Sequence, residues 1–250
     1  IGMKSNSKYV RKTSCPECGS KDNMAIYDDG HGFCFGCSYT MQPPRDKPRK
    51  SFIKTVKKPL LKFVTPKPLP KRGLSHETCE LFNYGISEHN GVPVQVATYE
   101  DKLGRPAAQH IRYQNKKFIW LGDVNDLQLW GQRLWRQQNT GGMFVTITEG
   151  EIDCMSVSQV QGNKFPVVSL PSGSQSANKY IAANLKWLSQ FVRIVICFDS
   201  DEPGMAAAEK AVKILPPGKA AICRLPRKDA NEMLIAGEGE KLKDLLWKAT

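Results

Sequence analysis

The sequence has no apolar run long enough to cross a membrane and nothing typical of a signal peptide, so we predict a cytoplasmic protein. Acidic residues are also in the minority, because 24 Asp and Glu stand against 36 Lys and Arg, for a formal net charge of +12. A chain of 250 residues is long enough for a small and a medium domain. Met3 follows Ile1 and Gly2, and we expect it to be the native first residue.

The cysteines do not form the regular framework of a disulfide-rich protein. Four of the eight lie in two close pairs near the N-terminus, and the other four are scattered along the chain: Cys79, Cys154, Cys197 and Cys223. Cys197 lies inside an apolar run that is predicted to be a buried strand. This distribution indicates buried thiols in a reducing compartment.

Residues 42–70 have the composition of a linker. Nine Lys or Arg stand against Asp46 alone, for a net charge of +8, and the segment holds seven of the sixteen prolines. Proline and lysine without apolar periodicity are typical of flexible segments, and a coil of this length spans on the order of 30 Å. The segment is either a solvated spacer or an additional attraction for a polyanion, and both roles are compatible.

Residues 3–41 are predicted to be a zinc ribbon. The pairs Cys15–Cys18 and Cys34–Cys37 are separated by fifteen residues, which is a zinc-ribbon spacing. Two residues between the cysteines of a pair let both thiolates reach one tetrahedral ion. A domain this small buries little core, so we expect structural Zn²⁺ to be required for folding. The Asp-Asp-Gly run at 28–30 should turn a hairpin between strands at 24–27 and 31–35.

The ribbon also carries His31, Phe33 and Phe35 just after the predicted turn. Aromatic rings with a histidine on a small domain suit stacking on bases and hydrogen bonding to base edges. The alternative for Phe33 is a place in the small core. We expect His31 to be exposed beside the two phenylalanines, since four cysteines already complete the shell of a zinc ion.

Residues 71–141 are predicted to be a small mixed α+β subdomain. Ser75 is a plausible N-cap for a helix that opens in residues 71–78. Strands are expected at 92–97, 108–113 and 117–121, with a turn at 101–104. Four basic side chains in this region either grip nucleotide phosphates or cover a solvated sheet face: His110, Arg112, Lys116 and Lys117.

Residues 142–250 show the alternation of strands and helices that is typical of a parallel sheet. Apolar strands are expected at 144–148, 167–170, 194–198 and 221–225. Helical segments are expected between them at 152–160, 177–190 and 203–215. The predicted fold class therefore combines a zinc ribbon, a flexible linker, a mixed α+β subdomain and an α/β parallel-sheet subdomain.

Acidic residues end two of these strands, in Glu149-Gly-Glu151 and Asp199-Ser-Asp201. The carboxyl ends of parallel strands meet at one edge of a sheet, where ligands bind, and like charges there repel unless a cation neutralises them. Mg²⁺ prefers oxygen ligands, so we predict a site for Mg²⁺ or Mn²⁺ that handles phosphates. Asp229, at the start of a later helix, is a fourth carboxylate at this edge. The simpler alternative is that these acids only end strands and cap helices.

Two of these motifs resemble the Toprim fold that bacterial-type primases share with topoisomerases and some nucleases: Glu149-Gly-Glu151 and Asp199-Ser-Asp201-Glu-Pro-Gly204. Three further segments make the resemblance more specific: the cysteine ribbon, Lys71-Arg-Gly-Leu-Ser-His-Glu-Thr78 and Lys228-Asp229-Ala-Asn231-Glu232. Residues 8–250 are similar to the primase half of the bifunctional primase-helicases of short-tailed phages. In the linker, only the general character matches.

The resemblance implies metal-dependent nucleotidyl transfer at Glu149, Asp199 and Asp201, and it implies that Asp229 is a further magnesium ligand. Glu149 is either a metal ligand or the base that accepts the hydroxyl proton. The resemblance also implies that Asp29, Gly30 and His31 of the ribbon contribute to reading the template. We predict that Phe35 binds the template with Asp29 and His31, through stacking of its ring on a base. His110 stands where the family has lysine, so the expected contact with nucleotide phosphates shifts toward Arg112 and Lys116.

The predicted function is a DNA primase that binds single-stranded DNA and ribonucleoside triphosphates and works with a replicative helicase and a DNA polymerase, in the host cytoplasm if a phage encodes it. No phosphate-loop ATPase motif precedes Thr250, so the helicase is expected either in a longer chain or as a separate protein. One alternative is a Toprim topoisomerase or nuclease, although none of the seven tyrosines lies in an identifiable nucleophile motif. Another is a zinc- and DNA-binding recombination mediator without catalysis, which the intact acidic set disfavours.

Overall fold

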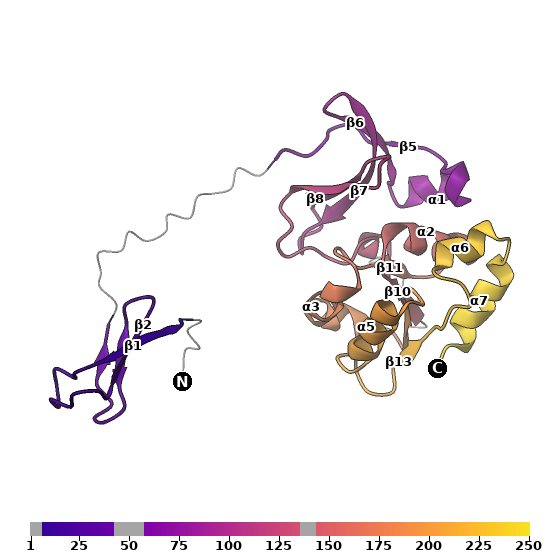
Figure 1. Ribbon diagram of the computed structural model, residues 1–250. Coiled ribbons are helices and arrows are strands. Elements are labelled where there is room, and N and C mark those ends of the chain that lie inside the picture. Colours follow the sequence, from indigo (N-terminus) through magenta and orange to yellow (C-terminus); the bar gives the residue numbers. More distant parts are fainter. Residues whose placement is uncertain (1–6, 43–57, 136–143) are drawn as a thin grey trace. The chain divides into compact units, whose positions relative to one another are not determined.

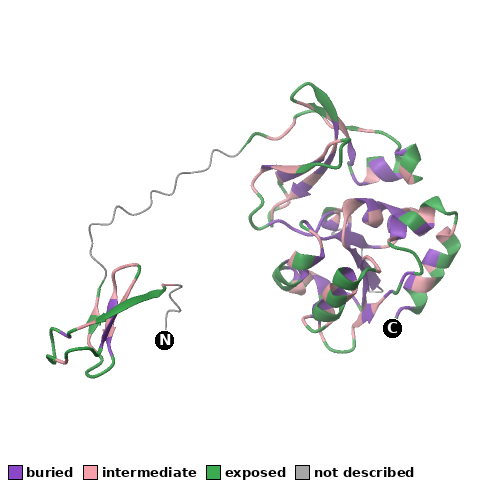
Figure 2. Cartoon of the chain, viewed as in Figure 1, coloured by how far each residue is buried: buried purple, intermediate pink, exposed green. Residues whose placement is uncertain are grey.

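The computed structural model describes residues 7–42, 58–135 and 144–250, and the chain divides at residue 57 into two compact units (Figure 1). In these ranges no helix is long and apolar enough to cross a lipid bilayer. Figure 2 shows that burial is concentrated in the strands of the second unit, while its helices expose one side.

The first unit is an antiparallel sheet of four strands in sequence order: β1 (Tyr9–Thr13), β2 (Met24–Tyr27), β3 (Gly32–Cys34) and β4 (Thr40–Met41). The predicted hairpin is confirmed, since β2 and β3 pair around the turn at 28–30, where Gly30 has a φ of 85°. The sequence does not predict β1, because its residues are mostly exposed and show no apolar alternation. Among the described residues of this unit, Cys15, Met24 and Cys34 form the small buried core, and Ala25 is also buried.

The second unit begins with a five-stranded antiparallel sheet, whose strands are β5 (Thr65–Pro66), β6 (Gly85–His89), β7 (Val92–Glu100), β8 (Pro106–Arg112) and β9 (Phe118–Gly122). The three predicted strands and the turn at 101–104 are confirmed. Asp101 closes this turn, because its Oδ1 accepts hydrogen bonds from the backbone N–H of Leu103 at 2.8 Å and of Arg105 at 3.0 Å.

The predicted linker is too long at its C-terminal end. Residues 58–70 lie on the second unit, where β5 pairs with β6 and the backbone N–H of Leu61 donates to the side chain of Gln109 at 2.7 Å. Leu60, Leu61 and Val64 pack on one face of the antiparallel sheet. Because proline and lysine dominate the composition here, the sequence predicts a linker even though these three apolar residues pack on the sheet. Residues 43–57 of the predicted linker lie outside the described residues.

A short helix, α1 (His76–Leu81), follows the 3₁₀ turn η1 (Pro70–Arg72) and has the predicted N-cap. The hydroxyl of Ser75 accepts a hydrogen bond from the backbone N–H of Thr78 at 3.2 Å. The Asn231 side chain donates to the carbonyl oxygen of Arg72 at 2.8 Å. Because Asn231 follows the parallel sheet, this contact ties the α+β subdomain to the C-terminal part of the same unit.

The C-terminal part is built on a parallel sheet with the strand order β11-β10-β12-β13, as predicted for its strands and direction. The strands are β10 (Phe144–Thr148), β11 (Val167–Ser169), β12 (Arg193–Cys197) and β13 (Ala220–Ile222). Every residue of β10 is buried, because helices cover both faces of the sheet. Thr148 pairs with Cys197, so the carboxyl ends of β10 and β12 lie side by side.

The helices form two groups around this sheet (Figure 1). One group contains α2 (Glu151–Val160), α6 (Ala230–Ile235) and α7 (Gly239–Lys248). The other contains η3 (Ser174–Ser176), α3 (Ala177–Ala183), α4 (Leu185–Leu188) and α5 (Glu202–Val212). The prediction of one helical segment over 177–190 is wrong, because Asn184 donates from its side chain to the carbonyl oxygen of Tyr180 at 2.9 Å and ends α3. A further 3₁₀ turn, η2 (Gln132–Trp135), precedes the parallel sheet.

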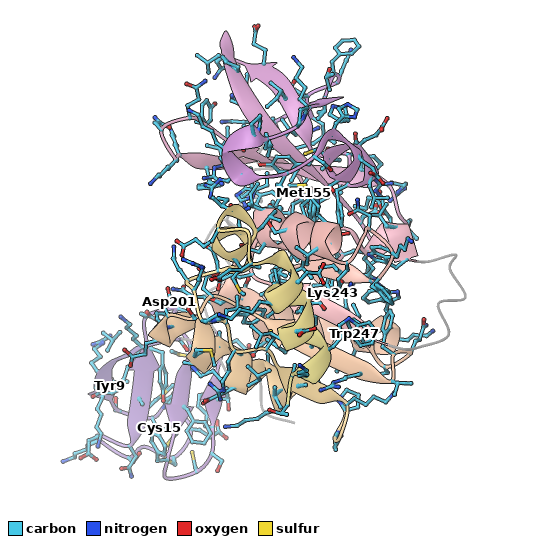
Figure 3. The ribbon with its side chains drawn as sticks, turned by 90° about the vertical axis from the view of Figure 1, so that its right-hand side faces the viewer. Tyr9, Cys15, Met155, Asp201, Lys243 and Trp247 are labelled. Atoms are coloured by element: carbon cyan, nitrogen blue, oxygen red, sulfur yellow. The ribbon has the colours of Figure 1, made fainter. Side chains whose placement is uncertain are left out.

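Helix α2 lies between the two sheets of the second unit, where Figure 3 labels Met155. Met155 is fully buried in a core that also contains Tyr99 of β7 and Val145 of β10. One continuous core therefore joins the antiparallel and parallel sheets, which fixes their residues relative to each other.

Candidate active site

The carboxyl ends of β10 and β12 bring two of the predicted acidic residues to one cavity of about 650 Å³. Glu149 follows β10 directly, and Asp199 follows β12 after Phe198. The turn after Asp199 is tight, since a Cβ at Gly204 would lie 2.3 Å from the carbonyl oxygen of Asp199. The sheet and this turn therefore hold the two carboxylates at the same edge.

One carboxylate oxygen of Glu149 accepts hydrogen bonds, and the other has no hydrogen-bond partner among the described residues. Its Oε1 accepts hydrogen bonds from the backbone N–H of Ser174 at 3.2 Å and from the Ser174 hydroxyl at 2.8 Å. Its Oε2 is buried and has no hydrogen-bond partner in the described part of the chain. A buried acceptor left unpaired costs about 1–3 kcal/mol, and more when it is charged. A cation beside Oε2 would remove this cost.

Asp199 has an environment that disfavours its charged form. Burial, followed by the negative charges of Glu149 and Asp229, raises the pKa of Asp199 to about 6. Lys228 acts in the opposite direction and also lines the cavity. The repulsion between carboxylates that the sequence predicted is therefore present at this edge.

Asp153 is an acidic residue of the cavity that the sequence analysis missed. It lies in the first turn of α2, and its Oδ1 accepts a hydrogen bond from the backbone N–H of Asn231 at 3.1 Å. Burial, then the charge of Asp229, and after these Asp199 and Glu149, raise the pKa of Asp153 to about 7. A signal was present, because Asp153 follows Glu149 by four residues on a helix that begins at the sheet edge.

Asp201 and Asp229 serve as helix N-caps beside the cavity. Asp201 Oδ1 accepts from the backbone N–H of Gly204 at 2.9 Å at the start of α5, where Figure 3 labels it, and Asp229 Oδ1 accepts from that of Glu232 at 2.8 Å at the start of α6. The simpler alternative of the sequence analysis thus describes one role of these two residues. Asp229 still raises the pKa of both Asp153 and Asp199 through its charge.

The carboxylates are spread around the cavity instead of forming one compact group. Among the described residues, no three carboxylates have ligand atoms that all lie within 4.8 Å of one another. This spacing fits Mg²⁺ or Mn²⁺ bound by one or two carboxylates, with water and phosphate oxygens as the other ligands. The unpaired Oε2 of Glu149 and the raised pKa of Asp199 make these two residues the best-fitting donors.

Glu151, the second acid of the Glu-Gly-Glu motif, faces the antiparallel sheet. Its Oε1 lies 2.7 Å from His110 Nδ1 and accepts a hydrogen bond from the Tyr99 hydroxyl at 2.7 Å. Burial opposes ionisation, but the hydrogen bond and charge of His110, together with Tyr99, hold the pKa of Glu151 below its ordinary value. Glu151 therefore already has hydrogen-bond partners in the protein and has less need of a metal ion.

The predicted phosphate-binding residues lie in two places. His110 and Arg112 line the cavity, with the His110 ring stacked at 4.5 Å from Trp120 and the Arg112 guanidinium 5.3 Å from the centre of the Phe118 ring. The Nδ1 of His110 is engaged by Glu151, which limits its contact with a phosphate. Lys116 and Lys117 are exposed in the turn between β8 and β9 and are not among the residues that line this cavity.

The four predicted zinc ligands meet in the first unit. Ligand atoms of Cys15, Cys18, Cys34 and Cys37 all lie within 4.8 Å of one another. The Sγ atoms of Cys15 and Cys37 are 3.7 Å apart, as are those of Cys18 and Cys34. Tetrahedral thiolates about 2.3 Å from one ion would be separated by roughly 3.8 Å. The arrangement therefore fits Zn²⁺ bound by four thiolates.

The residues predicted to read a template surround the ribbon hairpin. His31 Nδ1 lies 2.5 Å from Asp29 Oδ1, and the His31 ring stacks on Tyr27 at 4.3 Å. The expectation that His31 lies exposed beside Phe33 and Phe35 is therefore wrong, because its side chain is only 23% exposed. Phe35 is 67% exposed and its ring lies edge-to-face with that of Phe33, which is partly buried.

Comparisons with known proteins agree with this architecture. A family model described as "Bacteriophage T7 DNA helicase/primase, N-terminal a+b fold" matches residues 65–122, and a Toprim-like model matches residues 146–234. The DNA helicase/primase of Enterobacteria phage T3 is 35% identical over an alignment 257 residues long, which covers 98% of this chain. The chain spans less than half of that curated relative, 44% of its length.

Solved structures give the same assignment. The crystal structure of the primase fragment of the bacteriophage T7 primase-helicase protein is 35% identical, with a TM-score of 0.71 over 96% of this chain and 100% of that chain. A bacteriophage T7 lagging-strand DNA polymerase structure with primase domains bound to an RNA/DNA hybrid and dTTP is 40% identical, with a TM-score of 0.69 over 74% of this chain and 92% of that chain. The E. coli primase catalytic core, at 19% identity and a TM-score of 0.56 over 73% of this chain and 72% of that chain, shares the fold.

The four-cysteine ribbon, the antiparallel sheet and the Toprim sheet with its acidic edge define a Toprim-type primase architecture. The chain belongs to the phage primase-helicase family and corresponds to its primase part.

Proposed function

We propose that this chain is a DNA primase that joins ribonucleotides on a single-stranded DNA template by metal-dependent nucleotidyl transfer. The 3′ hydroxyl of one ribonucleotide attacks the α-phosphorus of the other, and pyrophosphate leaves. The observation that carries the proposal is the unpaired, buried Oε2 of Glu149 in a cavity shared with Asp199 and Arg112. A cation would stabilise a buried anionic oxygen of this kind, and a nucleoside triphosphate binds as a complex with Mg²⁺ or Mn²⁺.

Glu149 and Asp199 are the proposed principal ligands of Mg²⁺ or Mn²⁺, with Asp201 and Asp229 as the further ligands that the sequence predicted and Asp153 as the addition from the structure. When bound, the metal neutralises charge on the triphosphate and orients the attack. The two hydrogen bonds from Ser174 fix the Glu149 carboxylate, which favours the ligand role over that of a mobile base. Both Asp201 and Asp229 are fixed by helix capping.

Arg112 is the proposed main contact to the phosphates of the nucleotide, because it lines the same cavity as Glu149 and Asp199 and its guanidinium offers a fork of donors. His110 positions Glu151 and closes the cavity with its ring. Lys116 and Lys117, in the exposed β8–β9 turn, reach phosphates of a longer ligand such as the template or primer.

The first unit is the proposed template reader. Zn²⁺ held by the four cysteines would replace the core that this unit lacks. The Asp29–His31 pair offers hydrogen-bonding groups for base edges, and the exposed Phe35 offers a surface for base stacking. Proposed partners are single-stranded DNA, ribonucleoside triphosphates, a replicative helicase and a DNA polymerase, in the cytoplasm of a phage host.

The test is synthesis of a dinucleotide on single-stranded DNA templates of varied sequence. Glu149→Gln keeps the shape of the side chain but removes the charge, so we expect synthesis to fall at least about a hundredfold while template binding persists. Glu240→Gln is the matched control, since Glu240 is 91% exposed on α7. Wild-type activity in Glu149→Gln would refute the site, and nicked DNA in place of RNA would favour a Toprim nuclease.

A further inference from the structure

A second cavity, of about 690 Å³, adjoins the acidic one at Arg112, which lines both. Its walls come from η1, from the β6–β7 hairpin and from the residues after β8. The cavity is thus built by the α+β subdomain alone. It lies next to the reaction centre but contains none of the acidic residues proposed to bind metal.

Three cations line this second cavity: Lys71, Arg72 and Arg112. No Asp or Glu lines it, and within the described ranges none of the three forms a salt bridge with a carboxylate. Both guanidinium groups are held in place, because Arg72 donates to Asn231 Oδ1 at 3.1 Å and Arg112 lies over the Phe118 ring. Three positive charges that line one cavity without a carboxylate partner in the described part of the chain favour binding of an anion.

The other residues that line this cavity are mostly uncharged and apolar. Ile86, Pro93 and Val94 are apolar, and Gln95 adds an amide whose Oε1 accepts a hydrogen bond from the Tyr84 hydroxyl at 2.9 Å. A cavity lined by both apolar residues and three cations suits a ligand with one flat apolar end and one strongly anionic end. A nucleoside triphosphate has these properties, and the cavity volume is ample for one.

We propose that this cavity holds the 5′ phosphates of the ribonucleotide that starts the primer, a role that rests on the proposed primase function. Starting a primer requires two triphosphates at once. The one that reacts at its α-phosphorus needs metal-bound phosphates, which the acidic cavity provides. The starting nucleotide reacts only at its 3′ hydroxyl, so its phosphates need charge neutralisation but no metal. Lys71, Arg72 and Arg112 provide that neutralisation, and Arg112 places the two nucleotides side by side.

The first test measures binding of ATP, AMP and adenosine to the whole chain by calorimetry, in buffer freed of Mg²⁺ so that the acidic cavity contributes little. We expect ATP to bind more tightly than AMP or adenosine. Lys71→Ala should weaken ATP about tenfold, because it removes one charge-assisted contact, and Lys71→Arg should restore most of the loss. Lys67→Ala is the matched control, since Lys67 is exposed in the same segment and does not line the cavity.

The second test measures the first bond on a template, with a starting nucleotide that carries three, one or no 5′ phosphates. Wild type should prefer the triphosphate, and Lys71→Ala should lose this preference through a higher KM for the starting nucleotide. Extension of a supplied dinucleotide without 5′ phosphates should be unchanged, because that substrate never uses the cavity. Arg72→Lys, which keeps the charge and can still reach Asn231, should show a smaller loss, and thermal melting would confirm that both variants are folded.

The outcomes separate this proposal from the function on which it rests. Equal weakening of ATP by Lys71→Ala and Lys67→Ala would show a diffuse charge effect and refute the cavity site. If Lys71→Ala raised the KM equally for both nucleotides, the cavity would not be specific for the starting nucleotide and the proposal would be refuted. If Lys71→Ala lowered only the affinity for the template, the cavity would bind DNA phosphates instead, which would also refute the proposal. If the wild-type chain bound ATP in a way that depends on Lys71 but made no RNA, the phosphate site would be supported. Only the primase function would then be refuted.

Discussion

Replacing Asp153 with asparagine should stabilise the second unit at neutral pH when no Mg²⁺ is present. Burial and the charges of Asp229, Asp199 and Glu149 raise the pKa of Asp153 to about 7. A carboxyl group with a raised pKa in the folded state contributes full stability below its unfolded pKa and loses it as pH rises through the folded value. The free energy of unfolding of the wild type should therefore fall between about pH 4 and pH 7. Asparagine keeps an oxygen for the Asn231 backbone N–H but carries no charge.

The size of the effect follows from the difference in pKa. Each unit of pKa corresponds to about 1.4 kcal/mol, so the change from 3.8 to about 7 sets an upper limit of roughly 4 kcal/mol. The surrounding carboxyl groups share the proton, and Asp153 keeps some contact with solvent, so the net effect is smaller. We expect Asp153→Asn to be more stable than wild type by about 1–3 kcal/mol at pH 8 and equally stable near pH 4.

Urea unfolding followed by tryptophan fluorescence measures this effect. All five tryptophans lie between residues 120 and 247, so the signal reports the second unit without the ribbon. Asp244→Asn, at a 71% exposed position of α7, is the control and should leave the pH dependence unchanged. Added Mg²⁺ should recover wild-type stability at pH 8, because it binds the folded state. Parallel pH profiles for Asp153→Asn and wild type would refute the argument from like charges.

Three further changes test other parts of the molecule. Cys34→Ser should release zinc and unfold residues 14–40 while the tryptophan-monitored transition of the second unit stays in place; retention of stoichiometric zinc would contradict the four-thiolate site. His31→Ala removes the Asp29 contact and the ring stacked on Tyr27, and should impair initiation on a preferred template triplet but spare extension of a supplied primer; equal loss of both would count against a reading role. Glu151→Gln should lower stability by about 1–3 kcal/mol in thermal melting, because the partly buried His110 and the buried Tyr99 lose a charged acceptor; an unchanged melting temperature, as expected for Glu240→Gln, would argue against that link.

The parts of the fold that could be predicted from the sequence are those that depend on local patterns. The residues of β10 and β12 are short β-branched runs buried on both faces, and such runs identify strands of a parallel sheet without any knowledge of their neighbours. The C-terminal end of the linker could not be predicted in this way. Leu60, Leu61 and Val64 become recognisable as core residues only when the face formed by Val94 and Ile111 is known.

The same distinction applies to the acidic site. Glu149 and Asp199 could be predicted because a strand end fixes the position of the next residue. The spacing of Asp153 from Glu149 is visible in the sequence, but this spacing alone does not show which side of the first turn of α2 faces the cavity. The contact of His110 with Glu151 joins residues 41 positions apart, and no local pattern predicts it. The second cavity is even harder to predict from the sequence, because η1 and β8 meet there only through the packing of the whole subdomain.

The two glutamates of the Glu-Gly-Glu motif have opposite environments, and this contrast explains how the site is held. Gly150 between them is extended, with φ −129° and ψ 164°, so the chain leaves β10 and enters α2 with the two side chains in different surroundings. Glu151 is hydrogen-bonded to His110 and Tyr99 of the antiparallel sheet, whereas Glu149 keeps an unpaired oxygen. Only Glu149 therefore needs a cation. Because one residue separates them, the Glu151 contacts that join the two sheets also fix the carboxylate that faces the metal, and displacement of the antiparallel sheet would move Glu149 with it.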